Sequence, residues 1–191
     1  MVATVSIKKQ ESALAVDTVV AIALRKSLIN GGSMQARMKK YQLTRNQTEN
    51  LLKTEPVGRL ATLGEDGFPY ITPVHFVYMG GCIYFHGLAA GSKLANIQKD
   101  GRVCFEIERL ESLLHDANPC DTNTVYQSAI IMGRAEVVEG LEEKKGVLDA
   151  IVAKYTPQHR GREYPENMVK MTAVVRIAVT SCTGKYYPGT A

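Results

Sequence analysis

The 191-residue sequence is 22% charged and 45% hydrophobic, the composition of an ordinary globular protein that is long enough to bury a core without disulfides. Its net charge of +4 comes entirely from residues 1–43, where seven basic and two acidic residues give +5, so the remaining chain has a net charge of −1. A nearly neutral domain argues against a surface for the nucleic-acid phosphate backbone, and we expect no nucleic-acid partner.

The sequence also lacks the signs of a membrane or metal-binding protein. Its most apolar stretch, residues 14–24, is too short to cross a bilayer, contains Asp17 and lacks the features of a secretory signal. The cysteines are widely spaced and form no CxxC pair, which argues against a structural zinc site and is typical of reduced thiols. They are Cys82, Cys104, Cys120 and Cys182. We therefore expect a cytoplasmic protein with no metal site and no membrane partner.

The beginning of the chain differs from the rest. We interpret residues 1–37 as an N-terminal extension and residues 38–191 as one domain. Apolar residues at Leu14, Val16, Val20 and Leu24 predict a loosely amphipathic helix in the extension. Gly31–Ser33 would end that helix, so the extension is predicted to be partly helical.

Three helices are predicted in the domain. Thr44 and Gln47 fit a capping box at the start of the first. The second begins at Ser92, and Gly101 is placed to stop it. The third, residues 142–155, carries apolar side chains along one face.

The rest of the domain is predicted to be strands. Six runs rich in β-branched and aromatic residues span 58–63, 69–78, 82–86, 102–110, 124–139 and 171–182. The turn sequences EDG and GG separate the first three runs and predict hairpins. Six or seven antiparallel strands joined by tight turns, with few helices, predict a mainly β protein built as a small barrel.

One short stretch combines features of an anion site. The sequence CIYFHGLAAGSKLANIQKDGRV places His86 at the end of a strand and a helix N-terminus a few residues later. A helix N-terminus attracts phosphate, Gly91 allows close approach of the backbone, and Lys93 adds a full positive charge. The alternative is that Ser92 only caps a surface helix and that Lys93 is solvated, which is the commoner role of a serine there.

Arg59 and His86 are further candidates, each with a structural alternative. Arg59 opens the first strand, where it can meet a ligand anion or form an edge-strand salt bridge. His86 can meet a ligand or make a structural hydrogen bond.

Three blocks of sequence together resemble the pyridoxamine 5′-phosphate oxidase-like FMN-binding split-barrel family, in particular its 5-nitroimidazole antibiotic resistance branch. They are GRLATLGEDGFPYITPVHFVY, IYFHGLAAGSKLANIQKDGRVCFEIE and VYQSAIIMGRAEVVEGLEEK. The resemblance covers roughly residues 38–188. It implies a mainly β fold, a six-stranded antiparallel split β-barrel with flanking helices, and a homodimer with FMN in the clefts between subunits.

The resemblance also implies which residues hold FMN. Arg59, Ser92 and Lys93 match residues that contact its phosphate. Other matches border the flavin: Leu60, Ala61 and Thr62 on the first strand, His75 and Phe76 on the second, Phe85 and His86 on the third. Gln127 and Ser128 match the position where the partner subunit reaches the flavin. His86 also matches a histidine on the substrate side, which makes it the candidate catalytic residue, as a proton donor or as an orienting group.

The implied function is FMN-dependent reduction of small electrophilic molecules such as nitroimidazoles, with a nicotinamide as a possible electron donor. Vitamin B6 oxidation is not implied, because the chain has no tryptophan to match the C-terminal one of the authentic oxidases. Two alternatives stay open. One is a non-catalytic flavin-binding, storage or sensor protein, and the other is a haem-binding split barrel with His75, His86 and His115 as candidate ligands. Cys120 matches a cysteine of the branch, either as a packing residue or as a thiol near the substrate.

Overall fold

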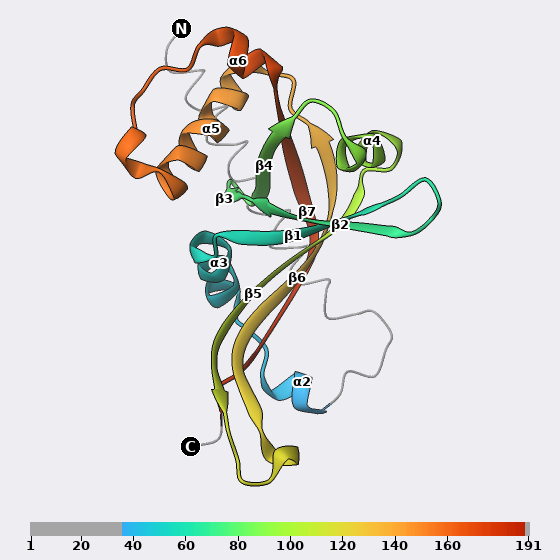
Figure 1. Ribbon diagram of the computed structural model, residues 1–191, viewed down its shortest axis with the longest axis vertical. Helices are drawn as coiled ribbons and strands as arrows, with labels where there is room; N and C mark the ends of the chain where they lie inside the picture. Colours follow the sequence, from blue (N-terminus) through green and yellow to red (C-terminus); the bar gives the residue numbers. More distant parts are fainter. Residues whose placement is uncertain (1–35, 190–191) are drawn as a thin grey trace, which may run out of the picture.

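The computed structural model of the protein describes residues 36–189 (Figure 1). The helices are α2 (Ala36–Lys40), α3 (Arg45–Thr54), α4 (Ser92–Lys99), α5 (Leu141–Tyr155) and α6 (Glu166–Met171), with short 3₁₀ turns η1 (Pro119–Asp121) and η2 (Pro157–His159). The strands are β1 (Val57–Leu63), β2 (Pro69–His75), β3 (Val77–Met79), β4 (Cys82–Leu88), β5 (Arg102–Leu114), β6 (Asn123–Val137) and β7 (Thr172–Tyr187). The helix predicted near residues 14–24 lies outside the described residues.

All seven strands form one antiparallel sheet in the order β2-β1-β5-β6-β7-β4-β3. The two edge strands, β2 and β3, follow each other in the chain and are separated only by Phe76. The sheet therefore curls until one stretch of chain, residues 69–79, lies at both of its edges, and within residues 36–189 no strand pairing closes it into a barrel. This confirms the predicted mainly β split barrel. The strand count is seven rather than six because the predicted second strand is interrupted at Phe76.

The interruption at Phe76 has a local cause. Its side chain is fully buried, and its N–H donates to the hydroxyl of Tyr155 at 2.8 Å instead of joining the sheet. Its carbonyl accepts a hydrogen bond from the ammonium of Lys154 at 3.1 Å. Both partners come from the last turn of α5. The backbone can leave the ladder here because side chains satisfy its polar groups.

Two apolar clusters hold the fold together. The first fills the inside of the curled sheet with side chains such as Phe85, Phe105 and Ile131, and α3 and α4 contribute to it through their buried leucines and isoleucine. The second lies on the opposite face of β4, under α5, where Val147 and Ile151 are buried. Each such side chain contributes about 1.5–3 kcal/mol of apolar burial. Consequently β4 is covered on both faces up to Phe85, whereas His86 and Leu88 are exposed.

A long arm extends from the barrel. β5, β6 and the second half of β7 form it and run past the barrel to the η1 turn (Figure 1). Residues 41–43 lie along the outer edge of β7, where the N–H of Leu43 donates to the carbonyl of Gly184 at 3.0 Å. The N–H of Tyr186 donates to the carbonyl of Tyr41 at 3.0 Å. The segment before α3 therefore covers an otherwise open strand edge.

Several predicted elements are confirmed. Thr44 and Gln47 form the capping box at the start of α3, where the Gln47 N–H reaches the Thr44 hydroxyl at 3.3 Å. The predicted second and third helices are present as α4 and α5, whereas α6 and η2 were not predicted. Within residues 36–189, no helix is long and apolar enough to cross a bilayer.

Candidate functional site

The predicted anion site lies where β4 ends and α4 begins. Gly91, rather than Ser92, is the N-cap of α4, and its φ of +126° is one that residues with a side chain rarely adopt. The N–H groups of Leu94 and Ala95 both donate to the carbonyl of Gly91. The N–H groups of Ser92 and Lys93 have no acceptor among the described residues. The first turn of α4 thus presents two free donors and a partial positive charge.

Lys93 brings a cation to the same place. The residue is half-buried, and a Cβ atom built on Gly87 would lie 3.8 Å from its Nζ and 3.7 Å from its Cε. Among the described residues, no carboxylate or other hydrogen-bond partner neutralises this ammonium. Lys93 lies within van der Waals reach of β4 at Gly87. A half-buried, unpaired cation beside free N–H groups is suited to bind a phosphate.

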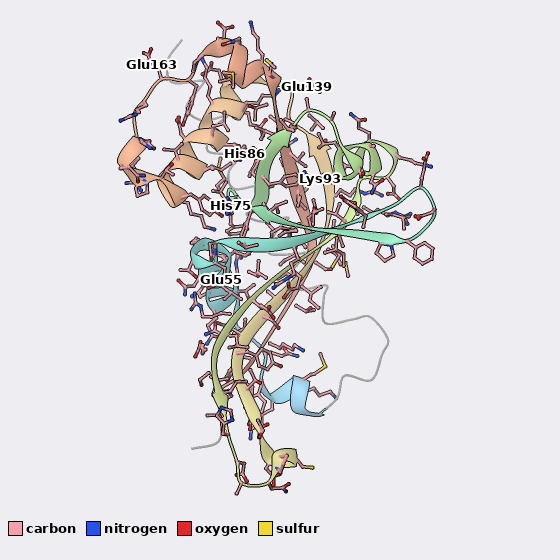
Figure 2. The ribbon with its side chains drawn as sticks, in the orientation of Figure 1. Glu55, His75, His86, Lys93, Glu139 and Glu163 are labelled. Carbon is pink, nitrogen blue, oxygen red and sulfur yellow. The ribbon has the colours of Figure 1, made fainter. Side chains whose placement is uncertain are left out.

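His86 lies on the other face of β4. Successive residues of a strand point to opposite faces, so His86 and Gly87 face opposite ways. Their cross-strand neighbours agree, because Val174, opposite His86, belongs to the cluster under α5, and Ala173, opposite Gly87, belongs to the inner cluster. Figure 2 shows His86 on the side of β4 toward α5 and Lys93 on the side toward α4. The structure therefore does not bring His86 and Lys93 together on one surface.

The end of β4 offers an edge between these two surfaces. β3 pairs only with Cys82–Tyr84, so the segment from Phe85 to Leu88 has no strand partner on that side among the described residues. A ligand lying along this edge can meet backbone N–H and C=O groups of β4, with Lys93 on one side and His86 on the other. We call this segment, residues 85–88, the open edge of β4.

His75 and His86 are close enough to interact electrostatically. Partial desolvation is the larger cause of the lowered pKa of His86, although part of the residue is exposed, and the charge of His75 is the smaller cause. His75 ends β2, and its ring stacks on that of Tyr155 with centroids 4.6 Å apart. A lowered pKa keeps the imidazole of His86 neutral at pH 7, when it can donate one hydrogen bond and accept another.

Other predicted site residues are too buried to offer their side chains to a ligand. Leu60, Phe76 and Phe85 have no exposed surface, and they pack inside the curled sheet. Thr62 is also buried; its hydroxyl donates to the carbonyl of Tyr70 and accepts from the amide of Asn96 at 3.0 Å, which ties α4 to β1. Because the whole residues are buried, they support the site from inside the barrel rather than contact a ligand at the surface. Ala61 is half-buried on the outer face of β1.

Arg59 is held by two carboxylates rather than left free. Its guanidinium lies 2.9 Å from Glu106 and 2.9 Å from Glu108, both on the neighbouring strand β5. The hydrogen bond to Glu106 is the largest cause that raises the pKa of Arg59. The side chain lies on the outer face of the sheet, because burial alternates along β1 and Arg59 is exposed between the buried Gly58 and Leu60. Any phosphate that Arg59 binds must therefore compete with two negative charges.

Gln127 and Ser128 lie on the arm, away from α4. The amide of Gln127 donates to Glu111 at 2.8 Å, and Ser128 stands opposite Lys185 of β7. Cys120 is exposed in the η1 turn and His115 is exposed just beyond β5, both at the far end of the arm. His115 thus lies apart from His75 and His86. Within the described residues, no cluster of three metal-ligating side chains is present.

Sequence reasoning missed the residues of α5 that shape the site. The hydroxyl of Tyr155 accepts from the N–H of Phe76 and has the carbonyls of Phe76 and Pro56 within 2.7 and 2.8 Å for its own proton. The ammonium of Lys154 lies 4.0 Å from the centre of the Phe76 ring, and burial lowers its pKa to about 8. Tyr155 is the last residue of the helix predicted over residues 142–155, and no sequence signal identifies its polar role.

Comparisons with known proteins agree with this fold. The sequence matches the family described as pyridoxamine 5′-phosphate oxidase over residues 44–186. None of the curated proteins compared with the chain matches it.

Among solved structures, a candidate 5-nitroimidazole antibiotic resistance protein from Bacteroides thetaiotaomicron VPI-5482 is 25% identical, with a TM-score of 0.68, covering 75% of this chain and 85% of its own. The FAD and heme binding protein from Mycobacterium smegmatis is 22% identical, with a TM-score of 0.71, covering 79% and 77%. The flavocytochrome Anf3 from Azotobacter vinelandii is 22% identical, with a TM-score of 0.68, covering 76% and 68%. The two relatives at 22% identity show a shared fold.

The family match runs from the capping box of α3 to the end of β7, and so includes every strand and the helix that carries Lys93. Fold and sequence lead to one conclusion: the chain belongs to the pyridoxamine 5′-phosphate oxidase family.

Proposed function

We propose that the protein is an FMN-binding flavoprotein that reduces small electrophilic molecules, such as nitroimidazoles, at a flavin in the interface of a homodimer. The observation that carries the proposal is Lys93, a half-buried ammonium with no partner among the described residues, beside the two free N–H groups of α4. These groups suit a dianionic phosphate, and each charge-assisted hydrogen bond to it contributes about 1.5–3 kcal/mol.

The relatives support a flavin as the ligand. One of the solved structures is named for binding FAD and haem, and another is a flavocytochrome. The relative from Bacteroides is named as a candidate nitroimidazole resistance protein, which supports a nitro compound as substrate. The absence of tryptophan from the sequence argues against oxidation of vitamin B6.

The chain's own residues would bind and orient the flavin and the substrate. Ser92 and Lys93 would hold the phosphate, and the open edge of β4 would offer backbone groups to the flavin. The flavin supplies the electron-transfer chemistry when bound. His86 would stand beside the site as a neutral imidazole, which can donate a hydrogen bond to an oxygen of the substrate. A nicotinamide would supply the electrons.

A dimer would complete this arrangement. Gln127 and Ser128 lie on the arm and do not reach α4 of their own chain, as expected if they serve the flavin of the partner subunit. Arg59 would contact the phosphate only if its ion pairs with Glu106 and Glu108 opened.

Haem is a second candidate ligand. His75 and His86 are close enough to affect each other's charge, and two solved relatives are named as haem or cytochrome proteins. A flavin-storage protein without catalytic activity is a third candidate function. His75 is already stacked on Tyr155, so its use as a haem ligand would require that contact to open.

The test is an absorption spectrum of the purified protein, repeated on the supernatant after heat denaturation. We expect released FMN, followed by oxidation of NADH or NADPH when a nitroimidazole is added to the loaded protein. FMN binding without turnover would favour the flavin-storage function over the reductase. A haem band, or a colourless protein that does not bind added FMN, would overturn the proposal.

A further inference from the structure

A second cavity, far from α4, is lined by tyrosines. It lies on the arm, where residues 38–41 meet the ends of β6 and β7, and its volume is about 410 Å³. Its walls include Tyr41, Tyr126, Lys185, Tyr186 and Tyr187. We call it the tyrosine groove. Its size falls within the range of about 300–1,000 Å³ that is usual for small-molecule sites.

The aromatic rings of the groove hold one another in defined orientations. Tyr41 meets Tyr186 at 5.6 Å and Tyr187 at 5.5 Å between ring centroids, in both cases nearly at right angles. Edge-to-face contacts of this kind are favourable and hold rings in defined orientations. The pairing of residues 41–43 with β7 fixes the backbone beneath them. A flat ligand would therefore enter a site with little rearrangement of its walls.

Lys185 gives the groove a positive charge. Its ammonium lies over the ring of Tyr126, 5.5 Å from the centroid. No acidic side chain lines the groove, and Lys185 forms no ion pair with any other residue in the described part of the chain. The cation is half-buried and has no counter-ion among residues 36–189. A ligand anion could accept the hydrogen bonds of the Lys185 ammonium, which no carboxylate among the described residues accepts.

We propose that the tyrosine groove binds a planar aromatic molecule that carries one negative charge, of which an aromatic carboxylate is the simplest example. The ring would lie among the tyrosines, and the carboxylate would pair with Lys185. None of the residues that line the groove was assigned to the flavin, and the groove is separate from Lys93 and α4. The proposal therefore goes beyond the proposed function and does not depend on flavin binding.

The groove also adjoins the part of the arm that we expect at the partner's flavin. Ser128 stands opposite Lys185 across the β6–β7 ladder, and Gln127 stands opposite Tyr186. A ligand bound in the groove would therefore lie next to the expected dimer interface.

The experiment compares benzoate with benzamide, which share a ring and differ in charge. Each is titrated by calorimetry into the full-length protein, with and without FMN. We expect benzoate to bind at least about tenfold more tightly, because only it can accept a charge-assisted hydrogen bond from Lys185. Lys185→Met should remove this preference, and Lys53→Met, which changes an exposed lysine on α3, should keep it.

A second measurement does not rely on variants. With ring-labelled tyrosine in the natural sequence, benzoate should shift the NMR signals of Tyr126 and Tyr186. Equal affinity for the two ligands, absence of these shifts, or a preference that survives Lys185→Met would overturn the proposal. So would displacement of benzoate by FMN, because the probe would then be reporting the flavin site.

Discussion

The ring of Tyr155 stacks on the ring of His75, with centroids 4.6 Å apart and planes 23° apart. The hydroxyl of the same tyrosine binds the backbone of Phe76, the next residue, at the break between β2 and β3. One side chain from α5 thus fixes both the break in the strand and the position of His75, whose charge contributes to the lowered pKa of His86. The geometry of the candidate site therefore depends on the packing of α5 against the sheet.

Tyr155→Phe tests this role in stability. The variant keeps the stack on His75 but leaves the N–H of the fully buried Phe76 without an acceptor. We expect the free energy of unfolding in urea to fall by about 1–3 kcal/mol, the usual cost of an unsatisfied buried group. Tyr164→Phe is the matched control, because that hydroxyl meets Asp149 at an exposed site, and its effect should stay below about 0.5 kcal/mol. Equal effects of the two changes would contradict the assignment.

The pKa of His86 should respond to His75. His75→Phe removes a charge and keeps an aromatic ring to stack on Tyr155. The pKa of His86 should rise in NMR titrations but remain below 6.5, because desolvation is the larger cause of its shift. Since the folded pKa is lowered, the unfolded chain binds more protons near pH 6, and His86 makes the protein less stable as the pH falls below about 6.5. An unchanged pKa in His75→Phe would show that the two rings do not interact.

Lys93→Gln should weaken FMN binding by about tenfold to hundredfold, because the phosphate loses one charge-assisted partner. Flavin fluorescence titration gives the dissociation constants. Riboflavin, which has no phosphate, should bind both proteins equally well. Lys99→Gln is the control on the same helix, because this exposed lysine pairs with Glu65 and not with a ligand. A loss that is as large for riboflavin as for FMN would mean that Lys93 does not hold the phosphate.

Arg59 should matter less than Lys93. Glu106 and Glu108 neutralise its guanidinium, so we expect Arg59→Gln to weaken FMN binding by less than Lys93→Gln does in the same titration. The double variant Glu106→Gln with Glu108→Gln frees the arginine and should tighten FMN binding if Arg59 faces the phosphate. A larger loss for Arg59→Gln than for Lys93→Gln would show that the ion pairs exchange for the phosphate on binding.

Local patterns determined most of the secondary structure. The capping box at Thr44, the glycine turn at residues 80–81 and the alternating strands were all visible in the sequence, because caps, turns and periodicity depend on neighbours within a few residues. The same local evidence located Lys93 at the start of a helix. Only tertiary structure decided which groups meet that helix and which do not.

Three relationships show why. Arg59 meets Glu106 across a strand pair formed by residues 47 positions apart, and Tyr155 reaches Phe76 over a separation of 79 positions. Lys93 and His86 are only seven positions apart in the sequence, yet they lie on opposite faces of β4. The sequence by itself determined most of the elements, the family and the chemical types at the site. Partners, faces and the tyrosine groove were decided by the curl of the sheet, because contacts between distant segments depend on how the whole chain packs.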